Sequence, residues 1–281
     1  MENNKQLYNR TMKQDILSLM MAYDDYIKDI EVKDNKVYII TKSGEKIIYD
    51  DKKNKTFNEK IYNSDIQDML EQIYPLETTR KLMNKDFDPG RFRVYSLLNY
   101  VYGNNSAIIQ KNLKNINTPY GTFQFNNNNK AAESLKKALD EIHSISKNNN
   151  KISSNISPIN GTFNYRHIAG TNLLSPHAFG IAIDLVRNNK DYWKWATEKQ
   201  GQERLNSYPK ELVEIFEKNN FIWGGKWNHF DILHYEYRPE IIIKSRYFKK
   251  NTNINDPWYK GAPIENEKIK EYIDKINNVL K

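Results

Sequence analysis

The sequence contains no cysteine among its 281 residues. This absence excludes disulfide bonds, thiolate metal ligands and a cysteine nucleophile, so any bound metal must rely on histidine and carboxylate ligands. Long apolar runs are also missing, since the longest, such as 17–22, fall far short of the roughly 20 residues that a membrane-spanning helix requires. The first residues are not followed by the apolar core of a signal peptide, so we expect that a leader was removed or that the chain is released by another route.

Positive charge is in excess. Lysine and arginine number 43 against 35 aspartates and glutamates, which gives a formal net charge of +8 and a pI of about 9.2. Such an excess favours an anionic partner, which can be nucleic acid, a membrane surface or an anionic wall polymer. The lysines are scattered and form no dense basic block, so charge gives nucleic-acid binding no specific support.

The first 87 residues are expected to form a small α+β unit. Apolar positions recur with helical spacing over 7–29, and a further helix is predicted at 64–74. Three short strand-like stretches lie between these helices, at 30–32, 36–41 and 45–49. Lys42, Ser43 and Gly44 separate the last two stretches and predict a hairpin turn. No catalytic motif is visible here, so the unit is either a targeting module or a support for the rest of the chain.

A second unit is expected over 88–250, followed by a tail over 251–281 that contains a packing helix. The predicted elements of the second unit are a helix at 91–102, a strand at 120–125 and a long helix at 130–146. The asparagine-rich stretch 148–155 is expected to be a loop.

Histidine is rare, and its clustering is informative. Only five histidines are present, at 143, 167, 177, 229 and 234, and four of them fall within 160–240. His177 begins the stretch that ends in a strand from Gly180 to Asp184, where Asp184 shares one face with Ala182. A carboxylate that points out of such an apolar strand needs a cation or several hydrogen-bond donors, because burying it alone is costly.

The second informative stretch contains Asp231 and His234. If 232–237 is another strand, His234 can meet Asp184 across the sheet. Two histidines and one aspartate supply three ligands and leave a fourth position for water, as a catalytic zinc ion requires. Asp231 stands three residues before His234, near enough to take a proton from that water.

These motifs carry a family resemblance. The pattern S-x-H-x-x-G-x-A-x-D, followed at a distance by W-G-G-x-W and D-x-x-H, resembles the zinc peptidases that include VanY-like D,D-carboxypeptidases and L-alanyl-D-glutamate endopeptidases. The likeness covers roughly 88–240. It implies an α+β fold of the hedgehog/D-Ala-D-Ala peptidase type, a small antiparallel sheet flanked by helices that lysostaphin-type enzymes share, here with an N-terminal α+β extension.

Position by position, the resemblance implies that His177, Asp184 and His234 bind Zn²⁺ and that Asp231 is the general base. Arg166 matches the arginine that precedes the first motif in such enzymes and polarises the substrate carbonyl. Its planar guanidinium also suits a substrate carboxylate. The D-x-x-H motif resembles the endopeptidase branch more than the carboxypeptidase branch, which usually shows E-x-W-H.

Other residues near the motifs have more than one interpretation. Ser175 is expected to form hydrogen bonds within the turn or to support a ligand. Trp223 and Trp227 either line a substrate groove or belong to the core. His167 and His229 stand near matched residues without occupying matched positions, which favours structural roles.

Taken together, the motifs predict a zinc-dependent peptidase that hydrolyses an amide bond in bacterial peptidoglycan stem peptides, first of all the L-alanyl-D-glutamate bond. A D,D-carboxypeptidase acting on D-Ala-D-Ala termini and a catalytically silent zinc-fold protein that binds the cell wall are the alternatives. Each of these functions places the protein at the cell wall, outside the cytoplasm, where its basic charge suits anionic wall polymers. Nucleic acid is not an expected partner.

Overall fold

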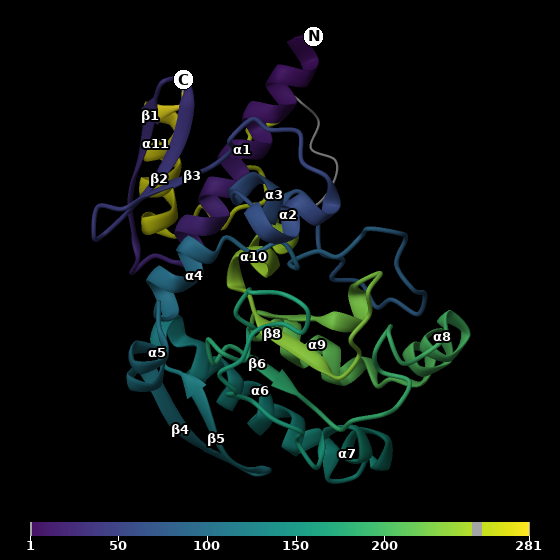
Figure 1. Ribbon diagram of the computed structural model, residues 1–281. Coiled ribbons are helices and arrows are strands. Elements are labelled where there is room, and N and C mark those ends of the chain that lie inside the picture. The colour runs from purple at the N-terminus through teal and green to yellow at the C-terminus, as the bar shows by residue number, and fades with distance from the viewer. Residues whose placement is uncertain (1, 249–254, 281) are drawn as a thin grey trace. The chain divides into compact units, whose positions relative to one another are not determined.

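The computed structural model describes residues 2–248 and 255–280, which fold into two compact units (Figure 1). Unit 1 draws its described residues from Met1–Tyr74, Pro89–Val94 and Pro239–Lys281, and unit 2 comprises Pro75–Asp88 and Tyr95–Arg238.

These bounds differ from the expected ranges 1–87, 88–250 and 251–281. A helix that starts at Pro239 packs against the N-terminal helix and so belongs to unit 1. The segment before Pro89 belongs to unit 2, because Asn228 donates its backbone N–H to the Phe87 carbonyl. Residues 251–254 of the expected tail lie outside the described residues.

The sheet of unit 1 is antiparallel with the order β1-β2-β3, formed by Ile27–Lys33, Lys36–Thr41 and Lys46–Ile48. Asp34 and Asn35 join β1 to β2 with φ angles of 50° and 58°, the left-handed pair that a two-residue hairpin turn needs. Gly44 has a φ of 88° and donates its backbone N–H to Thr41, so the predicted hairpin turn is present between β2 and β3.

The helices of unit 1 are α1 (Glu2–Ala22), α2 (Phe57–Asn63), α3 (Ile66–Leu70), α10 (Pro239–Tyr247) and α11 (Glu267–Val279). Helix α1 buries Met12, Ile16 and Leu19, which recur at helical spacing and form one apolar stripe, and Tyr23 directly after the helix is buried as well. Helices α10 and α11 pack on α1, and Figure 1 shows α11 in yellow beside strand β1.

The sheet that positions the site lies in unit 2. Its order is β6-β8-β7, formed by Ala182–Asp184, His234–Tyr237 and Phe221–Trp223, and both pairings are antiparallel. The register places Asp184 opposite His234 and Ile183 opposite Tyr235. A carboxylate and an imidazole therefore stand at the same end of two neighbouring strands.

The remaining elements of unit 2 surround this sheet. A separate hairpin consists of β4 (Leu113–Thr118) and β5 (Gly121–Asn126), and the helices are α4 (Tyr95–Tyr102), α5 (Ser106–Asn112), α6 (Ala131–Ser146), α7 (Asn150–Ile156), α8 (Glu198–Ser207) and α9 (Lys210–Lys218). Single 3₁₀ turns occur at Asn128–Lys130 and Gly224–Lys226. Helix α6 packs on the β4–β5 hairpin and on α9, and α9 packs on β7.

The expectation of a loop over 148–155 is wrong, because α7 occupies most of it. The Asn149 side chain caps this helix by accepting hydrogen bonds from the backbone N–H groups of Lys151 and Ile152. Ile152 and Ile156 lie four residues apart and are both buried, so one apolar face holds the helix against the unit.

Stacked aromatic rings form the core behind strand β8. The ring of Phe216 stacks on Tyr235 with a centroid distance of 4.1 Å, and Tyr208 stacks on Trp223 at 4.9 Å. All four rings are buried. Burying each such ring stabilises the fold by about 1.5–3 kcal/mol, so β8 is held firmly from behind.

The mixture of helices with small antiparallel sheets confirms the α+β class. The narrower assignment to the hedgehog/D-Ala-D-Ala peptidase-like fold stays a prediction. Among residues 2–248 and 255–280, no helix combines the length and apolarity needed to cross a bilayer.

Candidate metal centre

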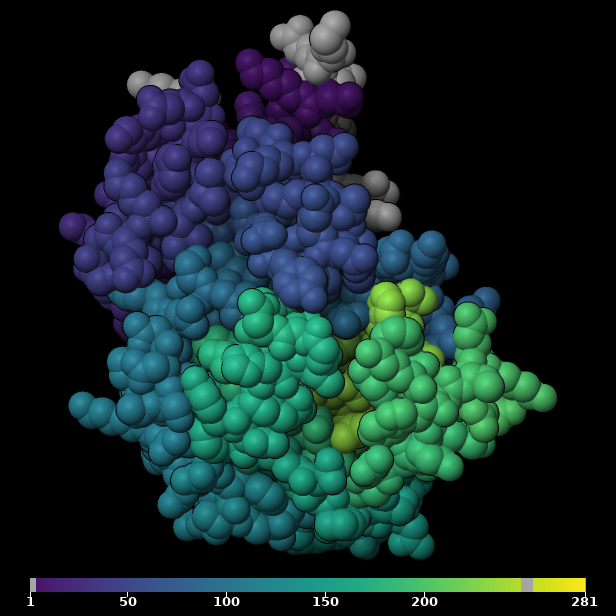
Figure 2. Space-filling view, viewed as in Figure 1, coloured from purple at the N-terminus to yellow at the C-terminus, as the bar shows by residue number. Residues whose placement is uncertain are grey.

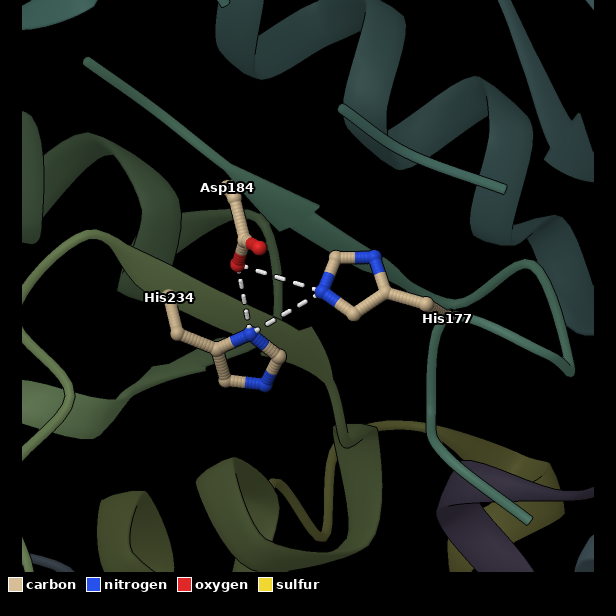
Figure 3. Close-up of side chains that lie close together, drawn as sticks. All are labelled: His177, Asp184 and His234. Atoms are coloured by element: carbon tan, nitrogen blue, oxygen red, sulfur yellow. Dashed lines mark hydrogen bonds and ion pairs between the residues drawn. The ribbon is translucent and has the colours of Figure 1, made fainter. Parts of the chain in front are cut away.

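Three side chains from separate segments of unit 2 converge on one point (Figure 3). Oδ1 of Asp184 lies 2.8 Å from Nδ1 of His234 and 3.1 Å from Nε2 of His177. The two imidazole nitrogens are 3.3 Å apart. The β6–β8 register brings Asp184 and His234 together, and the turn that precedes β6 supplies His177.

The turn that carries His177 is fixed by hydrogen bonds within the first motif. Oγ of Ser175 accepts a hydrogen bond from the backbone N–H of His177, and the Ser175 carbonyl accepts one from Ala178. Gly180 then closes the turn by donating its N–H to the His177 carbonyl. Gly180 has a φ of 69° and its carbonyl accepts from the backbone N–H of Asn126, so the turn is pinned to strand β5.

Each imidazole is oriented by a partner on its far nitrogen. Nδ1 of His177 lies 2.5 Å from the carbonyl oxygen of Thr162, which can accept a hydrogen bond from Nδ1–H, so that in the neutral imidazole Nε2 carries the lone pair. Nε2 of His234 lies 3.1 Å from Oε1 of Glu236. When the neutral imidazole carries its hydrogen on Nε2, Glu236 accepts this hydrogen bond and Nδ1 carries the lone pair. Both histidines can therefore present a lone pair to a shared ion.

Glu236 contacts the three-residue cluster, and the motifs did not reveal it. Its side chain is fully buried, it bonds His234, and its second oxygen lies 3.6 Å from the guanidinium of Arg238. The signal that was available is the spacing of His234 and Glu236, because residues two apart on a strand share one face.

The charges around the three side chains favour a cation between them. Burial opposes ionisation of Asp184, but hydrogen bonds from His177 and His234 outweigh it and hold the pKa of that carboxyl well below its usual range. Burial also opposes the charged form of His234, yet its bonds to Asp184 and Glu236 raise the pKa of this histidine to about 10. The carboxylates of Asp184 and Glu236 thus favour a positive charge at this point. When no other cation is bound, protonation of His234 supplies this charge.

The donor set fits zinc. Nitrogen and oxygen ligands bind Zn²⁺ at roughly 2.0–2.1 Å, which places neighbouring ligand atoms of a tetrahedron about 3.3 Å apart. The three donor atoms here are 2.8–3.3 Å apart, so their spacing matches three corners of such a tetrahedron. The fourth corner is left for a water molecule or a substrate oxygen.

Asp231 lies beside the three donors but is not one of them. Its backbone is held on both sides, because its N–H donates to the Gly224 carbonyl and its own carbonyl accepts from the N–H of His234. Burial raises the pKa of Asp231 to about 7, although the nearby charge of His234 acts in the opposite direction. Its carboxylate has no hydrogen-bond or ion-pair partner among residues 2–248 and 255–280. A carboxyl with these properties is suited to exchanging protons near neutral pH.

The structure does not bring Arg166 into contact with the three donors. Its side chain is exposed, and within the described ranges its one polar contact is at 3.5 Å, to the carbonyl of His167. Its backbone is close to the first motif, since the Arg166 carbonyl accepts the N–H of Ser175. The guanidinium can therefore reach the site only by a change of side-chain rotamer.

The two tryptophans of the second motif are both buried. Trp223 donates its indole N–H to the Ile232 carbonyl and packs in the aromatic core. The ring of Trp227 lies 5.8 Å from that of His234, so it packs directly beside a donor imidazole.

Two other histidines have structural partners. Nδ1 of His229 lies 2.5 Å from Oδ2 of Asp88, and its ring meets Trp193 edge to face. His167 is exposed and pairs through its backbone with Leu174 in a short hairpin.

In a second cluster of carboxylates, in unit 1, a lysine side chain supplies the positive charge. Asp50, Asp51 and Asp65 are close enough to share an ion. The ammonium group of Lys55 lies 3.1 Å from Asp51 and 2.8 Å from Asp65, so a lysine compensates their charge. The cluster in unit 2 has no such lysine or arginine among the described residues that line it.

Comparison with known proteins agrees with this geometry. Residues 169–237 match the sequence model of a family described as D-alanyl-D-alanine carboxypeptidase. A stretch of 67 residues is 39% identical to the peptidoglycan L-alanyl-D-glutamate endopeptidase CwlK of Bacillus subtilis (strain 168), and it covers 23% of this chain and 40% of that protein. No solved structure matches the chain.

These matches confirm the resemblance that the motifs indicated, over a narrower range than the expected 88–240. The matched range contains all three donors and Asp231, whereas Arg166 lies just before it. The chain spans less than half the length of the curated relative that it matches.

Proposed function

Because residues 169–237 resemble this family of peptidases, we propose that the chain is a zinc-dependent hydrolase of peptidoglycan stem peptides that cuts the L-alanyl-D-glutamate bond. The observation that carries this proposal is the convergence of His177, Asp184 and His234 within ion-binding distance of one another. The proposed place of action is the cell wall, outside the cytoplasm.

The site has the parts that amide hydrolysis requires. Zinc, when bound by the three donors, lowers the pKa of a coordinated water and polarises a carbonyl group. The carboxylate of Asp231 accepts a proton from the attacking water and then passes it to the leaving amine nitrogen. A base whose pKa is about 7 can do both near neutral pH, because it is neither too weak to accept the proton nor too strong to release it.

Arg166 is proposed to stabilise the oxyanion that forms as the carbonyl is attacked. Its exposed guanidinium has donors that few protein groups engage, and its backbone is anchored next to Ser175. Reorienting this side chain towards the substrate costs little, because it gives up one weak contact.

A hollow on the surface of unit 2 supports the proposal. Figure 2 shows that the viewed face of unit 2 is hollowed between the teal-green atoms of residues 160–180 and the green atoms of residues 190–210. Strands β6 and β8 lie under this part of the face in the same view (Figure 1). An extended peptide is a suitable occupant for such a hollow.

D,D-carboxypeptidase activity on D-Ala-D-Ala termini is the second candidate, because the matching family is described by that activity. The D-x-x-H motif and the identity with an endopeptidase favour the L-alanyl-D-glutamate bond. A catalytically silent wall-binding protein is the third. The carboxyl of Asp231 argues against it, because it lies beside the three donors and has no hydrogen-bond partner in the part of the chain that the structure describes.

Digestion of purified peptidoglycan separates these candidates. The zinc-loaded protein is incubated with the wall material, and the released fragments are analysed by mass spectrometry. An L-alanyl-D-glutamate endopeptidase leaves new alanyl carboxyl ends and new glutamyl amino ends, whereas a D,D-carboxypeptidase releases free D-alanine. Absence of any new terminus, with zinc bound in stoichiometric amount, contradicts the hydrolase proposal.

A further inference from the structure

An exposed arginine stacks on an exposed tryptophan beside the metal centre. The Arg187 guanidinium carbon lies 4.6 Å from the ring centroid of Trp195, and the Tyr192 ring lies 5.0 Å from the same tryptophan. Trp195 keeps 53% of its surface exposed, although large aromatic side chains are usually buried. The Tyr192 and Trp195 rings and the Arg187 guanidinium thus form one aromatic and cationic surface next to the site.

The loop that carries this stack is rigid. Asp191 is fully buried, and its carboxylate accepts hydrogen bonds from Nε of Arg204 and from the backbone N–H of Asn188, both at 2.7 Å. The carbonyl of Asp191 accepts the N–H of Ile232 at 2.7 Å. These bonds hold the shelf residues, defined as Arg187, Tyr192 and Trp195, in one place.

The shelf residues adjoin the proposed catalytic groups on two sides. Arg187 follows the donor Asp184 by three residues, which limits their Cα separation to about 11 Å. Tyr192 forms a backbone bridge with Asp231. The shelf is therefore next to both a metal donor and the proposed base.

The donors of Arg187 are unused by the protein. Within the parts of the chain that the structure describes, Arg187 has neither an ion pair nor a hydrogen bond, and its one contact of this kind is the stack on Trp195. Stacking through the face of the guanidinium leaves its five N–H donors free around the edge. A planar fork held in this way is preorganised for a carboxylate.

We infer that Arg187, held by Trp195, binds the free carboxylate of the glutamyl residue at the bond that is cut. The inference rests on the proposed function and adds how the substrate is recognised. A glutamate within a peptide chain engages one of its two carboxyl groups in an amide and leaves the other one free. That free carboxylate is within a few bonds of the scissile nitrogen, as the shelf is within a few residues of Asp184 and Asp231.

The inference is tested with two synthetic peptides that differ at one group. One contains an alanyl-glutamyl bond with the free carboxylate, and the other has this carboxylate replaced by a carboxamide of the same shape. Their binding to the protein is measured by calorimetry, and their hydrolysis by the zinc-loaded protein is measured as kcat/KM. We expect the wild type to prefer the acid about tenfold, because a hydrogen bond to a charged group is lost in the amide.

The variants are Arg187→Gln and, as a matched control, Lys194→Gln. Lys194 is also exposed and lies over a neighbouring tryptophan ring, Trp193, at 5.3 Å. Arg187→Gln is expected to lose the preference for the acid, with kcat/KM for the acid falling about tenfold relative to that for the amide, and Lys194→Gln is expected to keep the preference. Trp195→Leu is expected to reduce the preference about threefold by releasing the guanidinium from its stack.

The outcomes separate the two proposals. The carboxylate assignment is overturned if the peptides are cut but Arg187→Gln still prefers the acid. It is also overturned if this variant loses the same factor in kcat/KM for both peptides. If the acid is bound more tightly through Arg187 but neither peptide is cut, the assignment stands and the proposed function falls. Unfolding followed by circular dichroism confirms that each variant is folded, which we expect because all three replaced side chains are exposed.

Discussion

The carboxylate of Glu236 lies 3.1 Å from Nε2 of His234, and the two side chains stand two residues apart on strand β8. The carboxylate fixes which way the imidazole faces and which nitrogen carries the proton. Since Glu236 is fully buried, this hydrogen bond is not shared with solvent. The strand thus supplies both a metal donor and the group that orients it.

Glu236→Gln is expected to weaken zinc binding about tenfold, because the charge that supports His234 is lost while the shape is kept. Competition with a chelator measures the zinc dissociation constant. Glu198→Gln, at an exposed position of helix α8, is the control for removing one negative charge. Unchanged affinity in a folded Glu236→Gln protein contradicts the supporting role of this carboxylate.

Replacement of the donors and of the base is expected to give different losses. His177→Ala and His234→Ala each remove a zinc ligand, so we expect loss of both bound zinc and peptidase activity. Asp231→Ala is expected to keep zinc and to lose turnover by about 10²–10⁴-fold. Metal analysis of the three proteins together with hydrolysis of peptidoglycan checks this. Full activity in Asp231→Ala contradicts the base assignment.

The local motifs were sufficient to predict which three side chains meet. The spacing of His177 and Asp184, with the last residue on a strand, predicts the observed convergence with His234 because antiparallel neighbours have a fixed register. Glu236 has the same kind of signal in its spacing from His234. It was missed because a buried glutamate needs partners that only the folded chain reveals.

The packing between segments that are far apart in the sequence could not be predicted from local sequence patterns. Strand β7 is fully buried along its three residues, so it shows no alternation of apolar and polar side chains. Helix α10 directly follows the last residues of unit 2 but packs in unit 1, and no local pattern encodes that choice of partner. The stack of Arg187 on the exposed Trp195 was missed because exposure is a property of the folded surface.

In the metal-free protein, Asp231 is expected to lower the free energy of unfolding by an amount that depends on pH. Its folded pKa of about 7 exceeds the usual value of 3.8, so the folded state binds the proton more tightly than the unfolded state. The free energy of unfolding therefore falls as the pH rises from about 4 to 7, and the cost is fully present above pH 7. We expect Asp231→Asn to be more stable than the wild type by on the order of 2 kcal/mol at pH 8.

Urea unfolding of both proteins at pH 4.5 and pH 8, with a chelator present, measures this difference. The advantage of Asp231→Asn is expected to be much smaller at pH 4.5, because this pH is only slightly above the usual pKa of 3.8 and little of the cost has yet developed. If Asp231→Asn is more stable than the wild type by the same free energy at both pH values, the difference arises from packing, and the raised pKa is contradicted.

Gly180→Ala is expected to destabilise the protein by about 2–4 kcal/mol and to weaken zinc binding. Gly180 has a φ of 69°, which an alanine adopts only with strain. An added Cβ lies 2.7 Å from Cδ2 of Leu113 and 3.1 Å from the backbone nitrogen of Asn126. Because the backbone of strand β5 cannot yield easily, the turn moves instead and displaces His177, which stands three residues earlier.

Gly170→Ala is the matched control for this prediction. Gly170 also has a positive φ, of 80°, but an added Cβ there meets nothing within 4 Å. We expect this variant to lose about 1 kcal/mol from strain alone and to bind zinc as tightly as the wild type. Thermal unfolding and chelator competition on the two variants separate strain from displacement. Equal loss of zinc affinity in both contradicts the pinning of the His177 turn against strand β5.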